Sequence, residues 1–255
     1  MNVLTLQIPK GGRCFVVGDV CGHFSELLRL VNQIELNPSR DKLILNGNFL
    51  GFSPASRQAI AWIDKPWVIP VLGRHEACIL QALKGADAPT LAGQWIDLLS
   101  KQDMEDWIRL LEAVPVALEA RTDDMHVVVS HCPLSHATSW EEQREALSSW
   151  SGTPDKVFSL FDGRLLGLGA TGKLATQFLY DAPGEPLSLS SFHAERPETP
   201  LLLKGRYAFL VGSAHMRHGS RYSHPCLLPY AELTTLRQSI DGDTVCHGSL
   251  DIRAK

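Results

Sequence analysis

Short apolar runs alternate with helix-like patterns along the first third of the chain. Residues 14–17 form a continuous apolar run, and apolar residues then recur at helical spacing from Leu27 to Ile34. The runs 43–45 and 67–72 are each followed by a further helical pattern. Strand–loop–helix units in succession predict a largely parallel sheet with helices packed on its faces. The loops after such strands meet at the carboxyl edge of the sheet, where binding sites form.

The rest of the chain predicts further strands and helices. Apolar runs at 115–118, 127–129 and 207–211 indicate strands. Residues 92–112 have the pattern of a helical hairpin, and 138–150 that of a single helix.

One stretch, 181–200, is rich in proline, serine and glutamate, which favours a surface loop over a domain boundary. We therefore predict one domain over residues 1–255.

Composition and charge exclude several classes of protein. Apolar residues make up 44% and charged residues 20% of the 255, as in ordinary globular proteins. A net charge of −4 argues against general nucleic-acid binding, because no basic excess is present to neutralise phosphates. No apolar run is long enough to span a membrane, and the start of the chain lacks a signal-peptide pattern. The six scattered cysteines favour reduced thiols. We expect a cytoplasmic protein that binds neither nucleic acid nor a membrane.

Five loops at strand ends carry the candidate chemistry. Each combines glycine or a small residue with polar side chains: Gly18-Asp19-Val20-Cys21-Gly22-His23, Gly47-Asn48-Phe49-Leu50-Gly51-Phe52, Gly73-Arg74-His75-Glu76, Ser130-His131-Cys132 and Gly212-Ser213-Ala214-His215. In order and spacing they resemble the motifs of the bacterial and phage branch of the phosphoprotein phosphatase family, among the calcineurin-like metallophosphoesterases. The resemblance implies an α/β fold, the four-layer αββα sandwich. It also implies, for active members, two divalent ions bridged by an aspartate and a hydroxide.

Three residues match the family's functional positions. Asp19 matches the first-metal aspartate, and His131 matches a second-metal histidine. His75 matches the histidine that protonates the leaving group. The resemblance therefore gives Asp19 and His75 as vestigial catalytic positions.

Other positions depart from the family. Cys21 stands where a first-metal histidine is expected, and Asn48 replaces the bridging aspartate. Arg74 and Ser213 replace two further metal ligands.

A second departure concerns phosphate binding. Gly51 and Phe52 replace an aspartate–arginine pair, which removes the partner that orients His75 and a phosphate clamp.

These departures predict a pseudophosphatase that lacks a cofactor. Hard divalent ions prefer carboxylate oxygens, and a permanent guanidinium beside the second site repels a cation. The alternative is an active phosphoesterase with a rebuilt site. It would hold one zinc or manganese ion through Asp19, Cys21, Asn48 and His131.

For a pseudophosphatase the expected role is to bind or regulate a protein partner. Candidate binding residues are Arg74, Phe52, Phe49 and His215. The apolar side chains of the second loop either fill the former cleft or present a contact surface. Arg74 is expected to replace the lost cation by pairing with Asp19, or to hold an anion such as phosphate.

Overall fold

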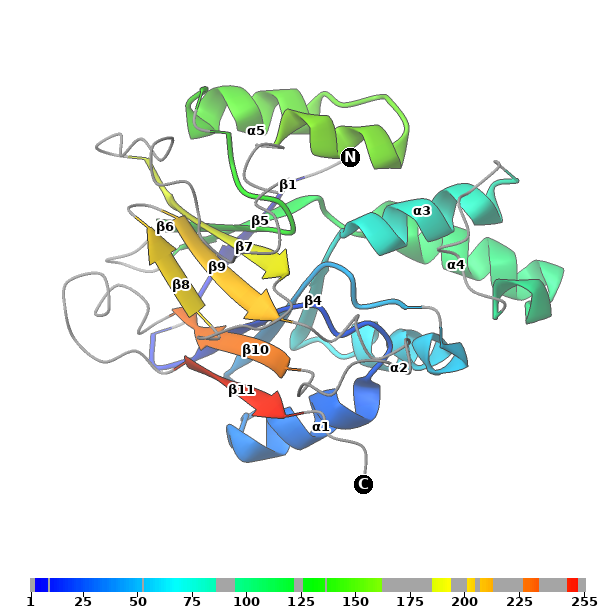
Figure 1. Ribbon diagram of the computed structural model, residues 1–255, viewed down its shortest axis with the longest axis horizontal. Helices are drawn as coiled ribbons and strands as arrows, with labels where there is room; N and C mark the ends of the chain where they lie inside the picture. The colour runs from blue at the N-terminus through cyan, green and yellow to red at the C-terminus, as the bar shows by residue number, and fades with distance from the viewer. Residues whose placement is uncertain are drawn as a thin grey trace.

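The computed structural model describes residues 3–8, 10–51, 53–85, 95–121, 126–135, 137–161, 185–193, 201–204, 207–212, 227–233 and 247–251. Its strands are β1 Val3–Gln7, β2 Cys14–Val17, β3 Lys42–Asn46, β4 Val68–Val71, β5 Ala117–Arg121, β6 His126–Ser130, β7 Leu187–His193, β8 Leu201–Lys204, β9 Tyr207–Gly212, β10 Leu227–Glu232 and β11 His247–Asp251. Within the described chain they form two mixed sheets, ordered β1-β5-β6-β7-β9-β8 and β11-β10-β2-β3-β4 (Figure 1).

Helices cover the outer faces of both sheets. They are α1 Phe24–Gln33, α2 Ala59–Ile63, α3 Arg74–Leu83, α4 Lys101–Ala113 and α5 Trp140–Ser148, with 3₁₀ helices at Pro54–Gln58, Ile96–Leu98 and Pro154–Leu160. In Figure 1, α1 and α2 lie beside the sheet that contains β2, and α5 lies on the opposite side of the molecule. The two sheets are therefore sandwiched between helical layers.

Alternation along the strands explains this layering. Val16 and Ile44 pack with Leu118 in a core between the two sheets. Their neighbours Phe15 and Leu43 point the other way, into the core shared with the helices. Side chains on a strand alternate between faces, so strands buried on both faces consist of continuous apolar runs. The predicted α/β sandwich fold is confirmed.

The three early strand–loop–helix units also form as predicted. Strands β2, β3 and β4 are parallel neighbours. The sheet is not parallel throughout, because β10 pairs with β2 in antiparallel fashion. The carboxyl ends of β2, β3 and β4 thus lie at one edge, where the three loops follow.

Two predictions about secondary structure are wrong. The stretch 181–200 contains β7, which pairs with β6 and β9 inside a sheet. Its serines at 188, 190 and 191 are buried rather than exposed in a loop. The predicted hairpin over 92–112 also fails in its described first arm, which holds only a 3₁₀ turn. After this turn, Ser100 forms a capping box with Asp103, and α4 begins at Lys101.

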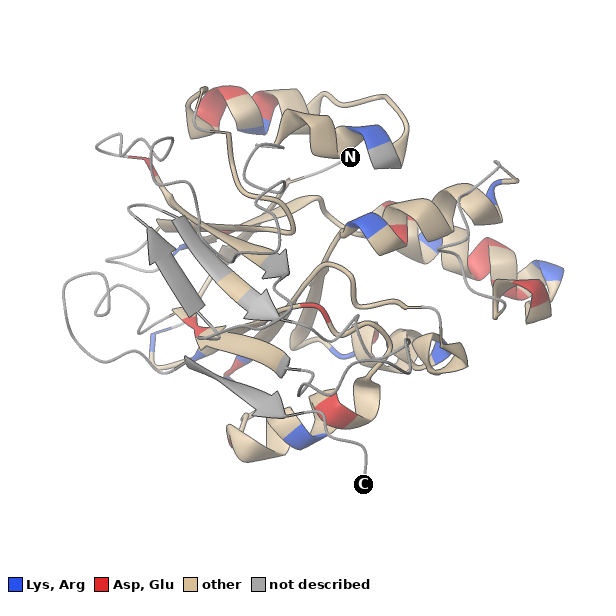
Figure 2. Cartoon of the chain, in the orientation of Figure 1, with Lys and Arg blue, Asp and Glu red and all other residues tan. Residues whose placement is uncertain are grey.

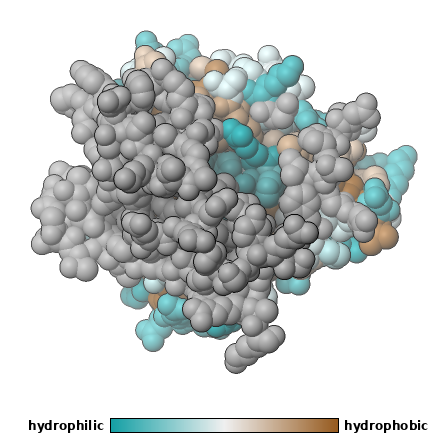
Figure 3. Space-filling model, viewed as in Figure 1, coloured by the Kyte–Doolittle hydropathy of each residue, from teal (hydrophilic) through white to brown (hydrophobic). Residues whose placement is uncertain are grey.

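Charged residues lie mainly on the helices, and the described strands are mostly uncharged (Figure 2). In Figure 3 the described residues around the margin of this face are mainly hydrophilic, with hydrophobic ones scattered among them. The large exposed hydrophobic residues of the described chain are Leu4, Leu28 and Leu98, which belong to different elements. None of the helices in the described ranges has the length and apolar character needed to cross a membrane.

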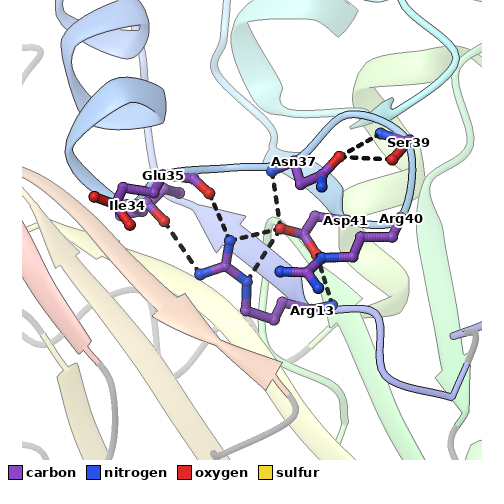
Figure 4. Close-up of polar contacts among 7 residues, drawn as sticks. All are labelled: Arg13, Ile34, Glu35, Asn37, Ser39, Arg40 and Asp41. Carbon is purple, nitrogen blue, oxygen red and sulfur yellow. Dashed lines mark hydrogen bonds and ion pairs between the residues drawn. The ribbon is translucent and has the colours of Figure 1, made fainter.

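Arg13 and Asp41 hold the start of β2 against the end of α1 (Figure 4). The Arg13 guanidinium donates to Asp41 Oδ2 at 2.6 Å and to the carbonyl oxygens of Ile34 and Glu35 at 3.2 and 2.7 Å. Asp41 is fully buried and also accepts from the backbone N–H groups of Arg13 and Asn37. Burial raises the pKa of Asp41, but the bonds from Arg13 and Asn37 outweigh it and hold the pKa below its ordinary value. This ion pair fixes the strands that lead into the candidate site.

Candidate functional site

The loops after β2 and β3 are joined through their backbones. The Cys21 N–H donates to the Asn48 carbonyl oxygen at 2.8 Å, and the Gly22 N–H donates to the Phe49 carbonyl oxygen at 2.9 Å. Cys21 and Asn48 have φ angles of 49° and 48°. Such left-handed conformations are uncommon outside glycine, although asparagine tolerates them better than most residues. Asparagine at position 48 is therefore compatible with the left-handed backbone of this turn.

Gly73 marks the closest approach of the third loop to the second. A Cβ atom at Gly73 would lie 2.1 Å from the Asn48 nitrogen and 2.6 Å from Glu76 Oε2. No side chain fits there without moving the backbone. The glycine before α3 is therefore required by packing.

Glu76 connects the second and third loops from inside the protein. Its carboxylate accepts hydrogen bonds of 2.8 Å from the backbone N–H groups of Asn48, Leu50 and Gly73. The side chain is completely buried. Burial raises the pKa of Glu76 to about 7, while the bonds from Leu50, Asn48 and Gly73 act in the opposite direction. Glu76 therefore links the second and third loops through hydrogen bonds to their backbones.

The Asn48 side chain links all three loops. Its Nδ2 donates to Asp19 Oδ2 at 2.7 Å, and its Oδ1 accepts from the His75 backbone N–H at 2.9 Å. We call this pair of hydrogen bonds the Asn48 bridge. The network fixes which amide atom is which, because a flipped amide would point its NH₂ at the His75 N–H and its oxygen at a carboxylate. The atom facing Asp19 is thus a hydrogen-bond donor.

His75 keeps an orienting partner despite the change at Gly51. Its Nδ1 lies 2.9 Å from the Leu50 carbonyl oxygen. A carbonyl only accepts, so Nδ1 carries the proton in this contact. The expectation that Gly51 leaves His75 without an orienting group is wrong, because the backbone next to Gly51 supplies one. No sequence motif signals such a carbonyl.

His131 lies at the end of β6, close to Asp19. Its Nδ1 is 3.1 Å from the Asn46 carbonyl oxygen and 3.9 Å from Asp19 Oδ1. The ring packs edge-on against Phe158, and the residue is 5% exposed. The structure therefore brings together Asp19, Asn48, His75 and His131, as the motif alignment predicts.

Arg74 begins α3 and is exposed. Its guanidinium lies 6.0 Å from the centre of the Phe158 ring and hydrogen-bonds to the Cys132 side chain. Burial raises the pKa of Cys132 to about 11, and the Arg74 charge opposes that rise. Arg74 forms no ion pair with Asp19, although both belong to the described chain. The predicted pairing of Arg74 with Asp19 is therefore not seen among the described residues, and Asn48 Nδ2 contacts Asp19 Oδ2 instead.

Phe49 is fully buried and belongs to the core that packs against the helices. It cannot present a contact surface. For Phe49, the prediction that the apolar side chains of this loop fill the interior is therefore correct. Phe52, Ser213 and His215 lie outside the described residues.

Trp95 was not predicted to contact the site. Its indole N–H donates to the Gly51 carbonyl oxygen at 3.0 Å, and its ring packs against Trp107 of α4 at 5.3 Å. The sequence places Trp95 among apolar core positions, and its N–H contact has no local signal.

Comparison with known proteins identifies the family. Residues 12–158 match the family model described as calcineurin-like phosphoesterase. The chain belongs to the calcineurin-like phosphoesterase family. Its phosphoprotein-phosphatase resemblance is confirmed by bacterial relatives. "Serine/threonine-protein phosphatase 2" of Salmonella typhimurium is 29% identical over 46% of this chain and 56% of its own length. The Escherichia coli protein of the same name is 27% identical over 59% of this chain and 72% of its own.

Other calcineurin-like relatives have different names. "Bis(5'-nucleosyl)-tetraphosphatase, symmetrical" of Yersinia enterocolitica is 28% identical over 48% of this chain and 41% of its own length. The chain thus spans about half the length of several curated relatives.

Solved structures agree on the fold. A serine/threonine phosphatase of Saccharomyces cerevisiae superposes with a TM-score of 0.63 at 11% identity, over 99% of this chain and 84% of its own. A candidate diadenosine tetraphosphatase superposes with a TM-score of 0.60 at 17% identity, over 97% of both chains.

The described side chains of this calcineurin-like phosphoesterase do not fit the pair of metal ions that the fold implies. In the described ranges, no three histidine, cysteine, aspartate or glutamate side chains are grouped so that they could hold a metal ion. Burial raises the pKa of Cys21 well above its ordinary value, and the charges of Asp19 and Glu76 raise it further. The thiolate is the metal-binding form of cysteine, and burial disfavours that form of Cys21 in the protein without metal. The amide of Asn48 directs a hydrogen, not a lone pair, at Asp19.

Proposed function

We propose that this chain is a catalytically degenerate serine/threonine-phosphatase-like protein that acts as a protein-binding or regulatory module. The observation that carries the proposal is the 2.7 Å bond from Asn48 Nδ2 to Asp19 Oδ2. In a dinuclear phosphoesterase a carboxylate shared by both ions occupies the Asn48 position. Here the Asn48 group is neutral and already uses both of its polar atoms inside the protein.

The charge distribution around the loops supports the same conclusion. Arg74 places a permanent positive charge at a position that corresponds to a metal ligand. In metal-assisted hydrolysis the metal ion lowers the pKa of its bound water to roughly 7. Without bound metal, the nucleophilic hydroxide is not available at neutral pH.

Hydrolysis and metal content test the degenerate state together. The purified protein should not hydrolyse p-nitrophenyl phosphate or a phosphothreonine peptide with manganese present, and elemental analysis should find no stoichiometric metal. Escherichia coli serine/threonine-protein phosphatase 2 serves as the positive control. Turnover that requires manganese and disappears in His75→Ala would refute the proposal.

A second candidate function is phosphoester hydrolysis at a rebuilt site with one zinc or manganese ion. The observation that favours it is the survival of Asp19 and His131, 3.9 Å apart, beside a His75 ring held by a carbonyl. The relatives' names give two substrate classes for the same assay, phosphoproteins and dinucleoside tetraphosphates. Stoichiometric zinc together with turnover would select this alternative.

The regulatory role requires a protein partner, which we place at the exposed Arg74 side chain at the start of α3. Affinity capture with the whole chain, followed by quantitative mass spectrometry, tests this placement. A specific partner should be lost with Arg74→Glu and kept with Arg109→Glu, a matched change at an exposed arginine of α4. If both variants retain the partner equally, Arg74 is excluded as its contact site.

A further inference from the structure

The Asn48 bridge lies at the sequence position that the family resemblance assigns to the metal-bridging aspartate. Asp19 follows β2, Asn48 follows β3, and His75 follows β4. The bridge connects these three loops through bonds of 2.7 and 2.9 Å. Asn48 is 4% exposed and Asp19 3% exposed, so both groups are removed from water.

We infer that the Asn48 carboxamide replaces the bridging metal as the element that holds these loops together, so that the site is assembled in a metal-independent way. The inference rests on the proposed loss of the dinuclear centre. In addition, the Nδ2 and Oδ1 atoms of Asn48 compensate for that loss. A carboxamide both donates and accepts, and the two neighbours here require one of each.

The backbone of Asn48 strengthens the argument. Its N–H donates to Glu76 Oε2 and its carbonyl oxygen accepts from the Cys21 N–H, each at 2.8 Å. All four polar groups of this residue are therefore satisfied by protein. Because a buried polar group without a partner is costly, the pairing of all four groups favours Asn48 at this position.

The same geometry predicts what an aspartate at position 48 would do. Asn48→Asp keeps the acceptor for the His75 N–H but places two carboxylates at the 2.7 Å contact with Asp19. Like charges at that distance in a buried site need a shared proton or a cation between them. The variant should consequently depend on an added divalent ion for its stability.

Thermal unfolding of the whole chain, in EDTA and in 1 mM manganese, tests the inference. The wild-type melting temperature should be the same in both. Asn48→Asp should melt about 10 °C lower in EDTA, the size expected for an uncompensated buried charge, and should regain at least half of that loss in manganese. Asn32→Asp, which adds the same charge at an exposed position of α1, should change little and ignore manganese.

A charge-exchanged variant covers the case in which Asn48→Asp does not fold. Asp19→Asn combined with Asn48→Asp restores one amide and one carboxylate with their roles reversed. The double variant should recover most of the loss in EDTA. A double variant that stays unfolded, an Asn48→Asp protein as stable as wild type in EDTA, or a wild type destabilised by EDTA would each overturn the inference. Manganese-dependent turnover in a wild type whose melting temperature ignores metal would instead refute the proposed function alone.

Discussion

Asp41→Asn should destabilise the protein strongly while leaving its shape almost unchanged. The Asp41 carboxylate is fully buried and accepts four hydrogen bonds, three from Arg13 and one from the Asn37 N–H. The amide can keep its oxygen at the Oδ2 position. Its NH₂ group then faces the Arg13 backbone N–H, which lies 3.0 Å from Oδ1 in the wild type.

The expected loss follows from these contacts. One buried N–H loses its acceptor, at about 1–3 kcal/mol, and the remaining bonds from Arg13 lose their charge assistance. Removing one partner of a buried ion pair usually costs about 3–5 kcal/mol. Some of the Arg13 bonds survive here, so we expect about 3 kcal/mol and a melting temperature lower by about 10 °C.

Urea unfolding at pH 7.5, followed by circular dichroism, measures the effect. Asp106→Asn is the matched control, because Asp106 pairs with Arg109 on the exposed side of α4 and should contribute less than about 1 kcal/mol. The pKa of Asp41 is held below its ordinary value of 3.8, so its contribution should persist at pH 5 and disappear only as the pH falls below that value. A loss under 1 kcal/mol at pH 7.5 would refute the reasoning.

Three further outcomes follow from the loops. Trp95→Phe removes one of two donors to the Gly51 carbonyl oxygen, which keeps the Ser56 hydroxyl, and should lower the free energy of unfolding by about 1 kcal/mol in urea. Gly73→Ala places a Cβ 2.1 Å from the Asn48 nitrogen and should cost more than about 4 kcal/mol, measured as lost folded protein or lowered melting temperature. Burial raises the pKa of Glu76 from 4.5 to about 7, so the folded protein holds this proton more tightly than the unfolded chain. That stabilisation is complete below pH 4.5 and is lost as the pH rises through 7, and Glu76→Gln should flatten the corresponding fall in urea midpoint.

The sequence predicts the early part of the fold well because its signals are local. Continuous apolar runs such as Phe15–Val17 belong to strands buried on both faces, and glycines follow them where loops approach closely. The strand β7 lacks such a signal. Ser188 accepts from the Leu134 N–H, and Ser191 contacts the Asn46 carbonyl oxygen, so these serines are satisfied only by residues distant in sequence. From the sequence alone, the polar composition of β7 is therefore typical of a loop, although the segment is a strand.

For the site, the motif alignment predicts positions but not partners. It brings Asp19, Asn48 and His131 together correctly, because their strands end at one edge of the fold. It fails for Arg74, since motif position does not reveal that the guanidinium turns to Phe158 and Cys132. It also cannot foresee a backbone carbonyl as the partner of a side chain.

The contacts inside the loops separate what depends on backbone atoms from what depends on side chains. Glu76 binds three backbone N–H groups, and those bonds do not depend on the side chains of the residues that donate them. Close packing at Gly73 likewise involves backbone atoms. Substitution at the Asn48 position leaves these backbone contacts in place and alters the contacts of its side chain to Asp19 and His75. There, one amide satisfies both neighbours, whereas a carboxylate would require a cation. Backbone contacts thus fix the course of each loop, while the Asn48 side chain ties Asp19 of the first loop to His75 of the third loop.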